Sequence, residues 1–414
     1  MSLDHTQTVF MKQSLSKCDR LADIGNEAFR VLRLPSSCSG SSIGLKVYVG
    51  MGRAAGDHCL VADRQQGPAD DRNASSISDL NNEEQEDSVA EGGIGISWTN
   101  EAMNSLVGCK ECSRGCHQCY AKLRVYRFSK SSVTNRDGRY SDLVELVRRP
   151  ASRDGGEEQK DELRFTGRIL FDPAKLYAFD RKRGFGNFVF VDEFSDLLHE
   201  AVPMDVVLEH FRVFRRVPWL QFQVLTKRAN RLKDLNDALI KEFGEWPKNV
   251  WMGLSVCTQA NGELNKIAAL GQTQARIKWV SFEPWISNPE MALEAACPNL
   301  AGLLGDSGIA WSVIGGESGT KKGSRLMTIE DAQYLFSSGK QAGCRLHFKQ
   351  LGTQLAINLG VYGIGDHRGK GGNLKQIPSS LRERDWPEDI TWDAPEGDLD
   401  FEPRFDPKKW IKFG

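Results

Sequence analysis

The sequence lacks any apolar run near the roughly 18 residues that a membrane-spanning helix needs. Its first residues lack the charged, then apolar, then small-residue order of a secretory signal peptide. An excess of one charge is also missing, because 54 Lys and Arg face 55 Asp and Glu, a net charge of −1. The composition excludes a basic nucleic-acid coat or an acidic tail as a description of the whole chain, but not a local basic groove. We expect a cytoplasmic protein with no membrane contact and with reduced thiols.

The chain has 414 residues, a length that suits one large domain or two ordinary ones. Residues 62–91 are polar and acidic and hold almost no large apolar side chain, so they cannot bury enough surface to offset the entropy of ordering. The expected organisation is an N-terminal extension with a disordered linker at 1–92, a main domain at 93–360 with an exposed insertion near 129–165, and a C-terminal tail at 361–414 that packs on the main domain.

From residue 187 onward, short β-branched and aromatic runs recur roughly every 30 residues, with segments of helical periodicity between them. One strand and one helix in each unit indicate repeated βα units around a parallel sheet. The runs hold few polar residues, as expected of strands that are covered on both faces. The expected strands are 187–193, 220–225, 249–256, 277–282, 309–314 and 345–348, and the expected helices are 204–214, 228–243 and 328–340.

A seventh strand is expected at Gly93–Trp98, just before a cysteine-rich segment. Seven strands that alternate with helices favour an α/β fold in the form of a complete or partial (β/α) barrel over an open doubly wound sheet. No Gly-x-Gly-x-x-Gly turn follows the first strand, which weakens the dinucleotide-binding alternative. In the insertion, we expect at most one helix, at Tyr140–Arg148.

Ligands of such barrels bind at the C-terminal ends of the strands, and here polar residues follow each of the later strands. We expect these ends to meet in one polar mouth. Lys227 and Arg228 are a cationic pair suited to a phosphate or carboxylate, and Glu283 is held extended by the proline that follows it. The candidate catalytic residues are Glu283, Lys227 and Glu317. The candidate cofactor-binding residues are Ser195, Asp196, Ser255, Gly315 and Gly316, with His199 as a weaker candidate.

Four of the ten cysteines fall within eleven residues, at Cys109, Cys112, Cys116 and Cys119, and such a cluster is typical of a metal or iron–sulfur site. A structural zinc site usually separates its two Cys-x-x-Cys pairs by a long loop, but only three residues separate them here. A ferredoxin-type run carries a proline after the last cysteine and usually a second cysteine set, and both are missing. The third alternative is a 4Fe–4S cluster held by three thiolates.

The spacing Cys112-x-x-x-Cys116-x-x-Cys119 is that of radical S-adenosylmethionine (SAM) enzymes, whose cysteine loop follows the first strand of a partial barrel. Three thiolates leave one iron free to bind the amino and carboxylate groups of SAM. Reduction through the cluster then cleaves SAM to methionine and a 5′-deoxyadenosyl radical, chemistry that belongs to the cofactor.

Further segments support a resemblance that covers most of residues 93–352. They are Ser97–Thr99, Gly108–Cys109, Gly115–Ala121, Phe190–Pro203, Phe222–Arg228, Trp246–Val256, Val280–Pro284, Val313–Gly319 and Phe348–Gly352. In this order they resemble the phage- and bacterium-associated three-cysteine family of the radical SAM superfamily. The resemblance implies a radical SAM type of barrel, a 4Fe–4S cluster and SAM as cofactors, and a three-Cys-motif partner protein, which is often encoded beside such proteins.

The resemblance and the superfamily spacing disagree on the first cluster ligand. The resemblance aligns it with Cys109, which we favour, whereas the superfamily spacing points to Cys112, so both remain candidates beside Cys116 and Cys119. Superfamily members often place an aromatic residue before the last cysteine. Here Gln118 stands at that position, and the aromatic Tyr120 follows the cysteine instead.

The sequence thus predicts a radical SAM enzyme that abstracts hydrogen from an unidentified substrate. A nucleotide or nucleic-acid base is a candidate because of the phage context of the family and the pair Lys227 and Arg228. The alternative is a non-catalytic zinc or iron–sulfur module that helps a partner protein to recognise nucleic acid.

Overall fold

The computed structural model describes residues 96–148, 161–179, 186–364, 369–392 and 401–414. All of them belong to the unit formed by residues 74–414. The predicted N-terminal extension and acidic linker at 1–92 lie outside the described residues. None of the helices in the described ranges combines the length and apolar character needed to cross a membrane.

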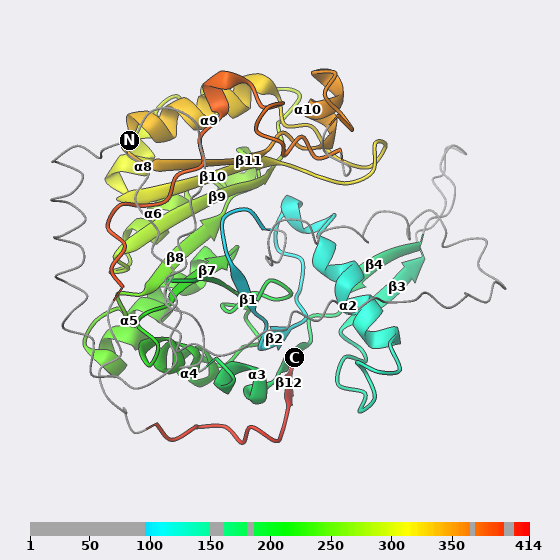
Figure 1. Cartoon of the computed structure of the whole chain (residues 1–414), viewed down its shortest axis with the longest axis vertical. Coiled ribbons are helices and arrows are strands. Elements are labelled where there is room, and N and C mark those ends of the chain that lie inside the picture. Colours follow the sequence, from blue (N-terminus) through cyan, green and yellow to red (C-terminus); the bar gives the residue numbers. More distant parts are fainter. Residues whose placement is uncertain (1–95, 149–160, 180–185, 365–368, 393–400) are drawn as a thin grey trace, which may run out of the picture. The chain divides into compact units, whose positions relative to one another are not determined.

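The central feature is a parallel sheet of seven strands (Figure 1). Its order is β1 (Glu101–Met103), β6 (Phe188–Val191), β7 (Gln221–Thr226), β8 (Val250–Ser255), β9 (Ile277–Trp285), β10 (Ile309–Gly316) and β11 (Arg345–Gln350). Every pair of neighbours is parallel. β1 and β11 are the two edges, so the curled sheet is a partial (β/α) barrel and not a complete one.

The helices that connect these strands cover the outer face of the sheet (Figure 1). They are α4 (Met204–Arg215), α5 (Leu232–Phe243), α6 (Lys266–Gly271), α7 (Leu293–Ala296), α8 (Leu300–Asp306) and α9 (Ile329–Gln341), followed by α10 (Thr353–Asn358). The six strands and three helices predicted from residue 187 onward are confirmed, with small differences at their ends. The repeated βα rhythm was informative because each unit must bury one apolar helix face on the sheet.

Two predictions upstream of residue 187 are wrong. The described part of the segment expected as strand 93–98 forms a turn, and the first strand lies at Glu101–Met103 instead. The expected helix at Tyr140–Arg148 is replaced by β3 (Val144–Arg148), which pairs antiparallel with β4 (Asp161–Phe165). Tyr140, Leu143 and Phe165 are buried, because the hairpin packs against α2 (Tyr120–Lys130), so the insertion is less exposed than expected.

Strand residues alternate between two cores, as the period of two in a β-strand requires. One set packs against the helices, and the other set faces the concave side, where aromatic rings gather at the N-terminal ends of the strands. Trp98 lies edge to face with both Trp279 and Trp311, and these two rings are tilted to each other; the centroids are 5.1–6.1 Å apart. Gly253 makes room for them, because a Cβ at this position would overlap the Trp279 ring. We call this region the aromatic floor.

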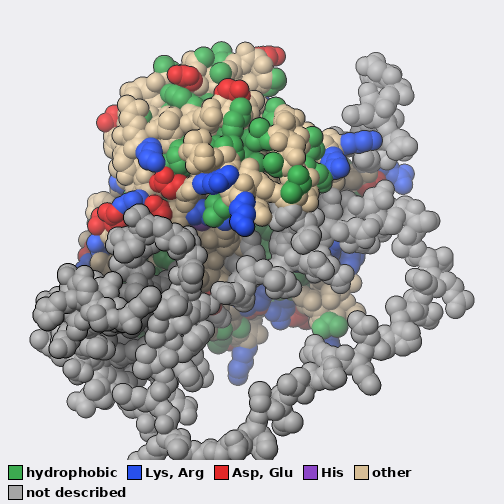
Figure 2. Space-filling view, turned by 45° about the horizontal axis from the view of Figure 1, so that its top comes forward, with side chains coloured by type: hydrophobic (Ala, Val, Ile, Leu, Met, Phe, Trp, Pro, Cys, Tyr) green, Lys and Arg blue, Asp and Glu red, His purple; other side chains and the backbone are tan. Residues whose placement is uncertain are grey.

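The C-terminal part of the chain contacts two separate parts of the fold. Trp386 stacks on Phe188 of the aromatic floor. β12 (Ile411–Phe413) pairs antiparallel with β5 (Ile169–Phe171), which also pairs with β2 (Leu106–Val107). The short helix α3 (Pro173–Tyr177) follows β5 and lies beside α4. The surface in Figure 2 shows exposed hydrophobic side chains among charged ones. Ile357 in α10, and Leu359 and Ile364 after it, are among the exposed hydrophobic residues.

Candidate functional site

The polar strand ends predicted from the sequence meet at one edge of the sheet, because all seven strands are parallel. The concave face therefore changes character along each strand. Trp279 of β9 belongs to the aromatic floor, and the same face of the same strand ends at Glu283. Likewise, the same face of β8 carries Trp251 in the aromatic floor and Ser255 at the polar end. We call the polar end the mouth.

The cysteine loop, residues 108–119, is anchored to this mouth by the strand ends beside it. Ser195 Oγ donates to the carbonyl of Gly108 at 2.7 Å, and the Gly108 N–H donates to the carbonyl of Phe194 at 3.1 Å. Gly108 has a φ of +104°, and a Cβ there would overlap the carbonyl oxygen of Arg168, so the tight entry to the loop requires glycine. Ser195, predicted to bind a cofactor, contacts the loop that carries Cys109.

Arg228 connects the mouth to the first cysteine. Its guanidinium donates to Asp196 and Glu200 at 2.8 Å each, and to the carbonyl of Lys110 at 2.9 Å. The Nη2 that donates to the Lys110 carbonyl also lies 3.8 Å from Cys109 Sγ. Asp196 accepts four hydrogen bonds, from Arg228, Thr226 Oγ1 and the backbone N–H groups of Lys227 and Leu198. This predicted cofactor ligand therefore orients Arg228 and is not free to bind.

Lys227 directly follows β7 and lies in electrostatic range of the cysteine loop. Burial lowers the pKa of Lys227, but the nearby thiols of Cys257, Cys116 and Cys119 act against burial and raise it above its ordinary value. The ammonium is therefore charged and in electrostatic range of the thiols, where it favours their ionised form. This places the predicted residue Lys227 directly beside the predicted metal ligands.

A fifth cysteine, Cys257, lies against the same loop. It is fully buried after β8, and its thiol contacts the carbonyl of Glu283 at 3.8 Å. A Cβ on Gly115 would overlap the Cys257 sulfur, so glycine at 115 lets the cysteine loop pack directly on the strand ends. In the sequence Cys257 lies far from the other four cysteines. Only its position after an expected strand indicated that it could lie at the mouth.

The thiols differ in their tendency to ionise. A hydrogen bond from Cys112 lowers the pKa of Cys116, with help from Lys227, whereas the same bond raises the pKa of Cys112. Burial raises the pKa of Cys109 to about 12 against the opposing effect of Arg228, and burial also raises the pKa of Cys119. Cys116 is thus the preferred thiolate of the set.

Three predicted site residues at the ends of β8, β9 and β10 have partners within the mouth: the hydroxyl of Ser255 and the carboxylates of Glu283 and Glu317. Glu283 forms an ion pair with Lys349 of β11, and its carbonyl accepts from Ser255 Oγ at 3.2 Å. The peptide bond from Glu283 to Pro284 is cis. Glu317 is 4% exposed and forms an ion pair with Arg325, so its carboxylate faces a cation and not open solvent.

The paired glycines after β10 have different environments. A Cβ on Gly316 would overlap the carbonyl oxygen of Leu351, so close packing of two backbones explains glycine there. At Gly315 a Cβ would lie 3.5–3.6 Å from Gln350 and Glu283, which is ordinary contact. Gly315 is therefore not required by backbone packing as Gly316 is.

Tyr120, the first residue of α2, follows the last cysteine of the loop, and its side chain is 51% exposed. Glu193, two residues after β6, accepts from Asn104 Nδ2 at 3.1 Å. The sequence did not show this contact.

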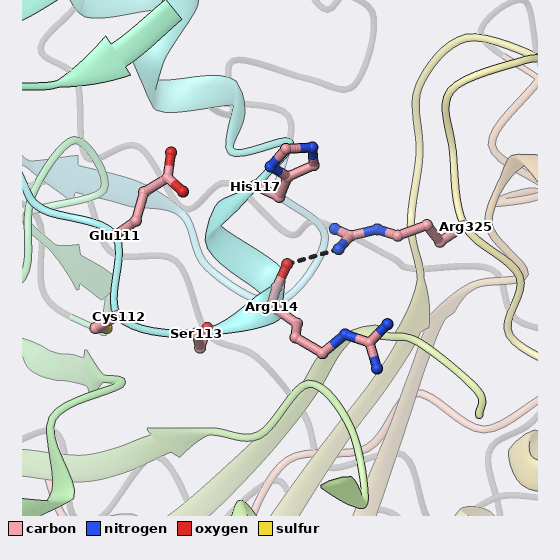
Figure 3. A pocket seen from close by; sticks show the side chains of 6 residues that line it. All are labelled: Glu111, Cys112, Ser113, Arg114, His117 and Arg325. Carbon is pink, nitrogen blue, oxygen red and sulfur yellow. Dashed lines mark hydrogen bonds between the residues drawn. The ribbon is translucent and has the colours of Figure 1, made fainter. Parts of the chain in front are cut away.

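An open cavity of about 500 Å³ lies on the outer side of the cysteine loop (Figure 3). Its lining residues are Glu111, Cys112, Ser113, Arg114, His117 and Arg325. Arg325 comes from the loop after β10 and donates to the carbonyl of Arg114 at 2.7 Å, the dashed line in Figure 3. The cysteine loop and the loop after β10 are therefore neighbours.

The chemistry of the donor set fits a group held by thiolates. Three thiols of one short loop, Cys112, Cys116 and Cys119, and the thiol of Cys257 lie in electrostatic range of the cationic Lys227, and Cys109 lies beside Arg228. Thiolates are the ligands of iron–sulfur clusters. Within the described residues, no three His, Cys, Asp or Glu side chains are already arranged around one point as ligands of a single metal ion. The fit therefore rests on the donor atoms and on the local charge.

A family model described as "Protein of unknown function (DUF5131)" matches residues 94–393. The match covers well over half of the chain, which therefore belongs to this family. It spans the seven-stranded sheet, the cysteine loop and the mouth. No match to this chain is found among curated proteins or among solved structures.

Proposed function

We propose that this protein is a radical SAM enzyme whose cysteine loop holds a 4Fe–4S cluster at the mouth of the partial barrel. When bound, such a cluster supplies the electron that cleaves SAM. The observation that carries the proposal is the position of four loop cysteines at the C-terminal edge of a parallel α/β sheet, in electrostatic range of the half-buried cation Lys227.

The residues of the mouth divide into ligands and supports under this proposal. Cys116 and Cys119 hold the cluster together with Cys109 or Cys112. Lys227 offsets the negative charge of the thiolates, and Arg228 holds the first part of the loop through the carbonyl of Lys110.

The other predicted residues also support this division. Ser195 and Asp196 anchor the loop and Arg228, and Ser255 holds the backbone of Glu283. Gly315, Glu283 and the exposed ring of Tyr120 are left to contact SAM or substrate, and hydrogen abstraction from that substrate is the proposed reaction. Glu317 and Gly316 shape the neighbouring loop.

Iron and sulfide analysis of anaerobically purified protein tests the proposal most directly. We expect a brown protein with about four irons per chain, which cleaves SAM when dithionite is added. Cys116→Ala and Cys119→Ala should each abolish cluster assembly. A colourless wild-type protein that binds one zinc would reject the enzyme and favour a binding module that helps a partner protein, such as a three-Cys-motif partner, to recognise nucleic acid.

The first ligand is identified by two single variants and their combination. If Cys109 binds the cluster, Cys109→Ser loses it and Cys112→Ser keeps it, and the superfamily spacing predicts the reverse. If either thiol reaches the same iron, only the double variant fails. A double variant that retains four irons would exclude both cysteines and direct attention to Cys257, whose sulfur contacts the loop at Gly115.

A further inference from the structure

Residues 401–414 run past α4 and α3 and end in β12 (Figure 1), and we call them the C-terminal clamp. Arg404 fixes the clamp to the outer helices. Its guanidinium forms ion pairs with Glu209 of α4 and Glu242 of α5, and its backbone N–H donates to Glu209 Oε1 at 3.1 Å. The side chain of Glu209 is fully buried, and a buried carboxylate is stable only when its partners are present. The contact with Arg404 is therefore part of how the helices themselves are satisfied.

The next residue, Phe405, links the same helices to β5. Its ring lies edge to face on Phe171, the last residue of β5, with centroids 5.3 Å apart and planes at 90°. Its backbone N–H donates to the Tyr177 hydroxyl of α3 at 3.2 Å, and this hydroxyl donates to Glu209 at 2.8 Å. An edge-to-face pair of rings contributes free energy beyond the area that it buries. The clamp is thus docked at two neighbouring residues before β12 begins.

β12 completes a sheet whose other two strands are very short. It pairs with β5 from Ile411 opposite Phe171 to Phe413 opposite Ile169, and β5 pairs with β2 on its other edge. β2 has two residues and β5 has three, and a lone pair of such strands is at best marginally stable in water. β12 therefore gives β5 a partner on both edges, and the sheet depends on the clamp.

This small sheet supports the first cysteine of the loop. β2 ends two residues before Cys109, and the N–H of Gly167, in the turn before β5, donates to the Cys109 carbonyl at 3.1 Å. The clamp packs on the same turn, because a Cβ on Gly414 would lie 2.8 Å from the Gly167 carbonyl oxygen. The backbone of Cys109 is therefore held from two sides by a sheet and a turn that both contact the clamp.

We propose that the C-terminal clamp holds the thiol of Cys109 in position at the mouth, and that Arg404 and Phe405 are the positioning residues that dock it. The inference rests on the proposed function in one respect, because the position of Cys109 matters to that reaction only if Cys109 binds the cluster. The effect on Cys109 itself requires neither the cluster nor SAM.

Site-resolved alkylation tests the inference. The full chain, reduced and freed of any bound iron, is treated with iodoacetamide, and the modified cysteines are identified by mass spectrometry over time. A thiol held by packing reacts at a rate that follows the local opening of its surroundings. Arg404→Ala/Phe405→Ala removes an ion pair and an aromatic contact, so we expect the rate at Cys109 to rise about tenfold.

An internal reference separates positioning from overall stability. Cys344 is 6% exposed, and its thiol donates to the carbonyl of Ile309 in the main sheet at 3.0 Å. In the double variant its rate should change less than about twofold, because the main sheet does not open with the clamp. Equal rises at Cys109 and Cys344 would overturn the inference, since they would show that the clamp only stabilises the whole fold. An unchanged rate at Cys109 would overturn it as well.

Two further variants sharpen the test. Lys408→Ala is the matched control, because it removes an exposed side chain of the same segment, and it should leave both rates within about twofold of wild type. Phe405→Ala alone should raise the rate at Cys109 about threefold, which keeps the test decisive if the double variant does not fold. Arg404→Lys retains the charge and should raise the rate less than Arg404→Ala does.

The two proposals fail in different ways. A protein that binds four irons and cleaves SAM, but whose Cys109 is unaffected by the clamp variants, removes only the clamp. A protein whose Cys109 is released by the clamp variants, but which assembles no cluster, removes only the radical SAM activity.

Discussion

The two ends of the same concave sheet face differ in almost every physical respect. The aromatic floor is built of Trp rings that are at most 2% exposed at Trp98, Trp279 and Trp311, and it is closed by Trp386 from the C-terminal part of the chain. The mouth is built of thiols, carboxylates and cations that satisfy one another. One set of strands therefore supplies a rigid base and a reactive edge, because alternate residues of each strand face the same side at both ends.

The difference indicates where stability and chemistry reside. Burial of aromatic area contributes free energy wherever it occurs, whereas buried charges contribute only when each is paired. The floor should therefore tolerate substitution poorly in unfolding experiments, and the mouth should respond mainly in its thiol chemistry. Five substitutions test this contrast, in order of decreasing expected effect.

Trp279→Ala should have the largest effect on stability. Trp279 is fully buried between Trp98 and Trp311, so its removal should lower the free energy of unfolding by about 3–5 kcal/mol. Urea denaturation followed by circular dichroism measures the change. Trp410→Ala, at a 37% exposed position, is the matched control and should lose less than about 1 kcal/mol. Equal losses would show that the floor is not a special source of stability.

Arg228→Met tests whether the mouth also contributes to the stability of the fold. The guanidinium is almost fully buried and pairs with Asp196, so its loss leaves an uncompensated buried carboxylate and should lower the free energy of unfolding by about 3 kcal/mol. Arg228→Lys should lose less, since it keeps the charge but not the fork of donors. The same denaturation series measures both. A Met variant as stable as wild type would mean that Asp196 is satisfied by its other donors alone.

Gly115→Ala should disturb the mouth more than the fold. The new Cβ overlaps the Cys257 sulfur, and the resulting displacement should lower the free energy of unfolding by about 1–3 kcal/mol. Alkylation of Cys116 by iodoacetamide, followed by mass spectrometry, should change in rate because the loop that sets its thiolate character has moved. The control is Gly305→Ala in α8, where a Cβ meets no atom within 4 Å. Unchanged reactivity at Cys116 would contradict the close packing described for Gly115.

The smallest effect concerns pH. Burial, then Arg384 and Lys349, lower the pKa of His347 near the floor from 6.5 to about 3. Between these values the unfolded chain binds a proton that the folded chain does not, so stability that is full above pH 6.5 falls as the pH falls, by at most about 1.4 kcal/mol per pH unit. His347→Gln should flatten this dependence in urea midpoints measured from pH 7 to 4.5.

The mouth contributes a pH dependence of opposite sign. Burial raises the pKa of Asp192 from 3.8 to about 7, against hydrogen bonds from Leu106 and Ser105. The folded chain therefore holds a proton that the unfolded chain releases, and stability from this group is lost as the pH rises from 3.8 through 7. Asp192→Asn should steepen the loss of stability on acidification. No change in slope for either variant would show that the two groups titrate alike in both states.

The repeated units from residue 187 onward were predictable from the sequence alone. Each strand of that region is an apolar run, each helix has its own periodicity, and a parallel sheet forces polar strand ends to one edge. The four cysteines of the loop were likewise evident from their spacing. The elements upstream were not, because β1 has only three residues and β3 carries a polar, half-exposed pattern that resembles a turn-rich insertion.

Which side chains act on one another was decided only by the tertiary structure. The sequence determined that Lys227, Glu283 and Glu317 end strands of one sheet, but Glu317 is held by Arg325, and Lys227 lies among thiols from two distant segments. Cys257 lies against the cysteine loop, and Tyr120 lies at the mouth, because the loop 108–119 packs on the strand ends. Sequence patterns report local periodicity, which the backbone imposes within a few residues, whereas ion pairs, close glycine contacts and recesses depend on distances between segments that the chain brings together only on folding.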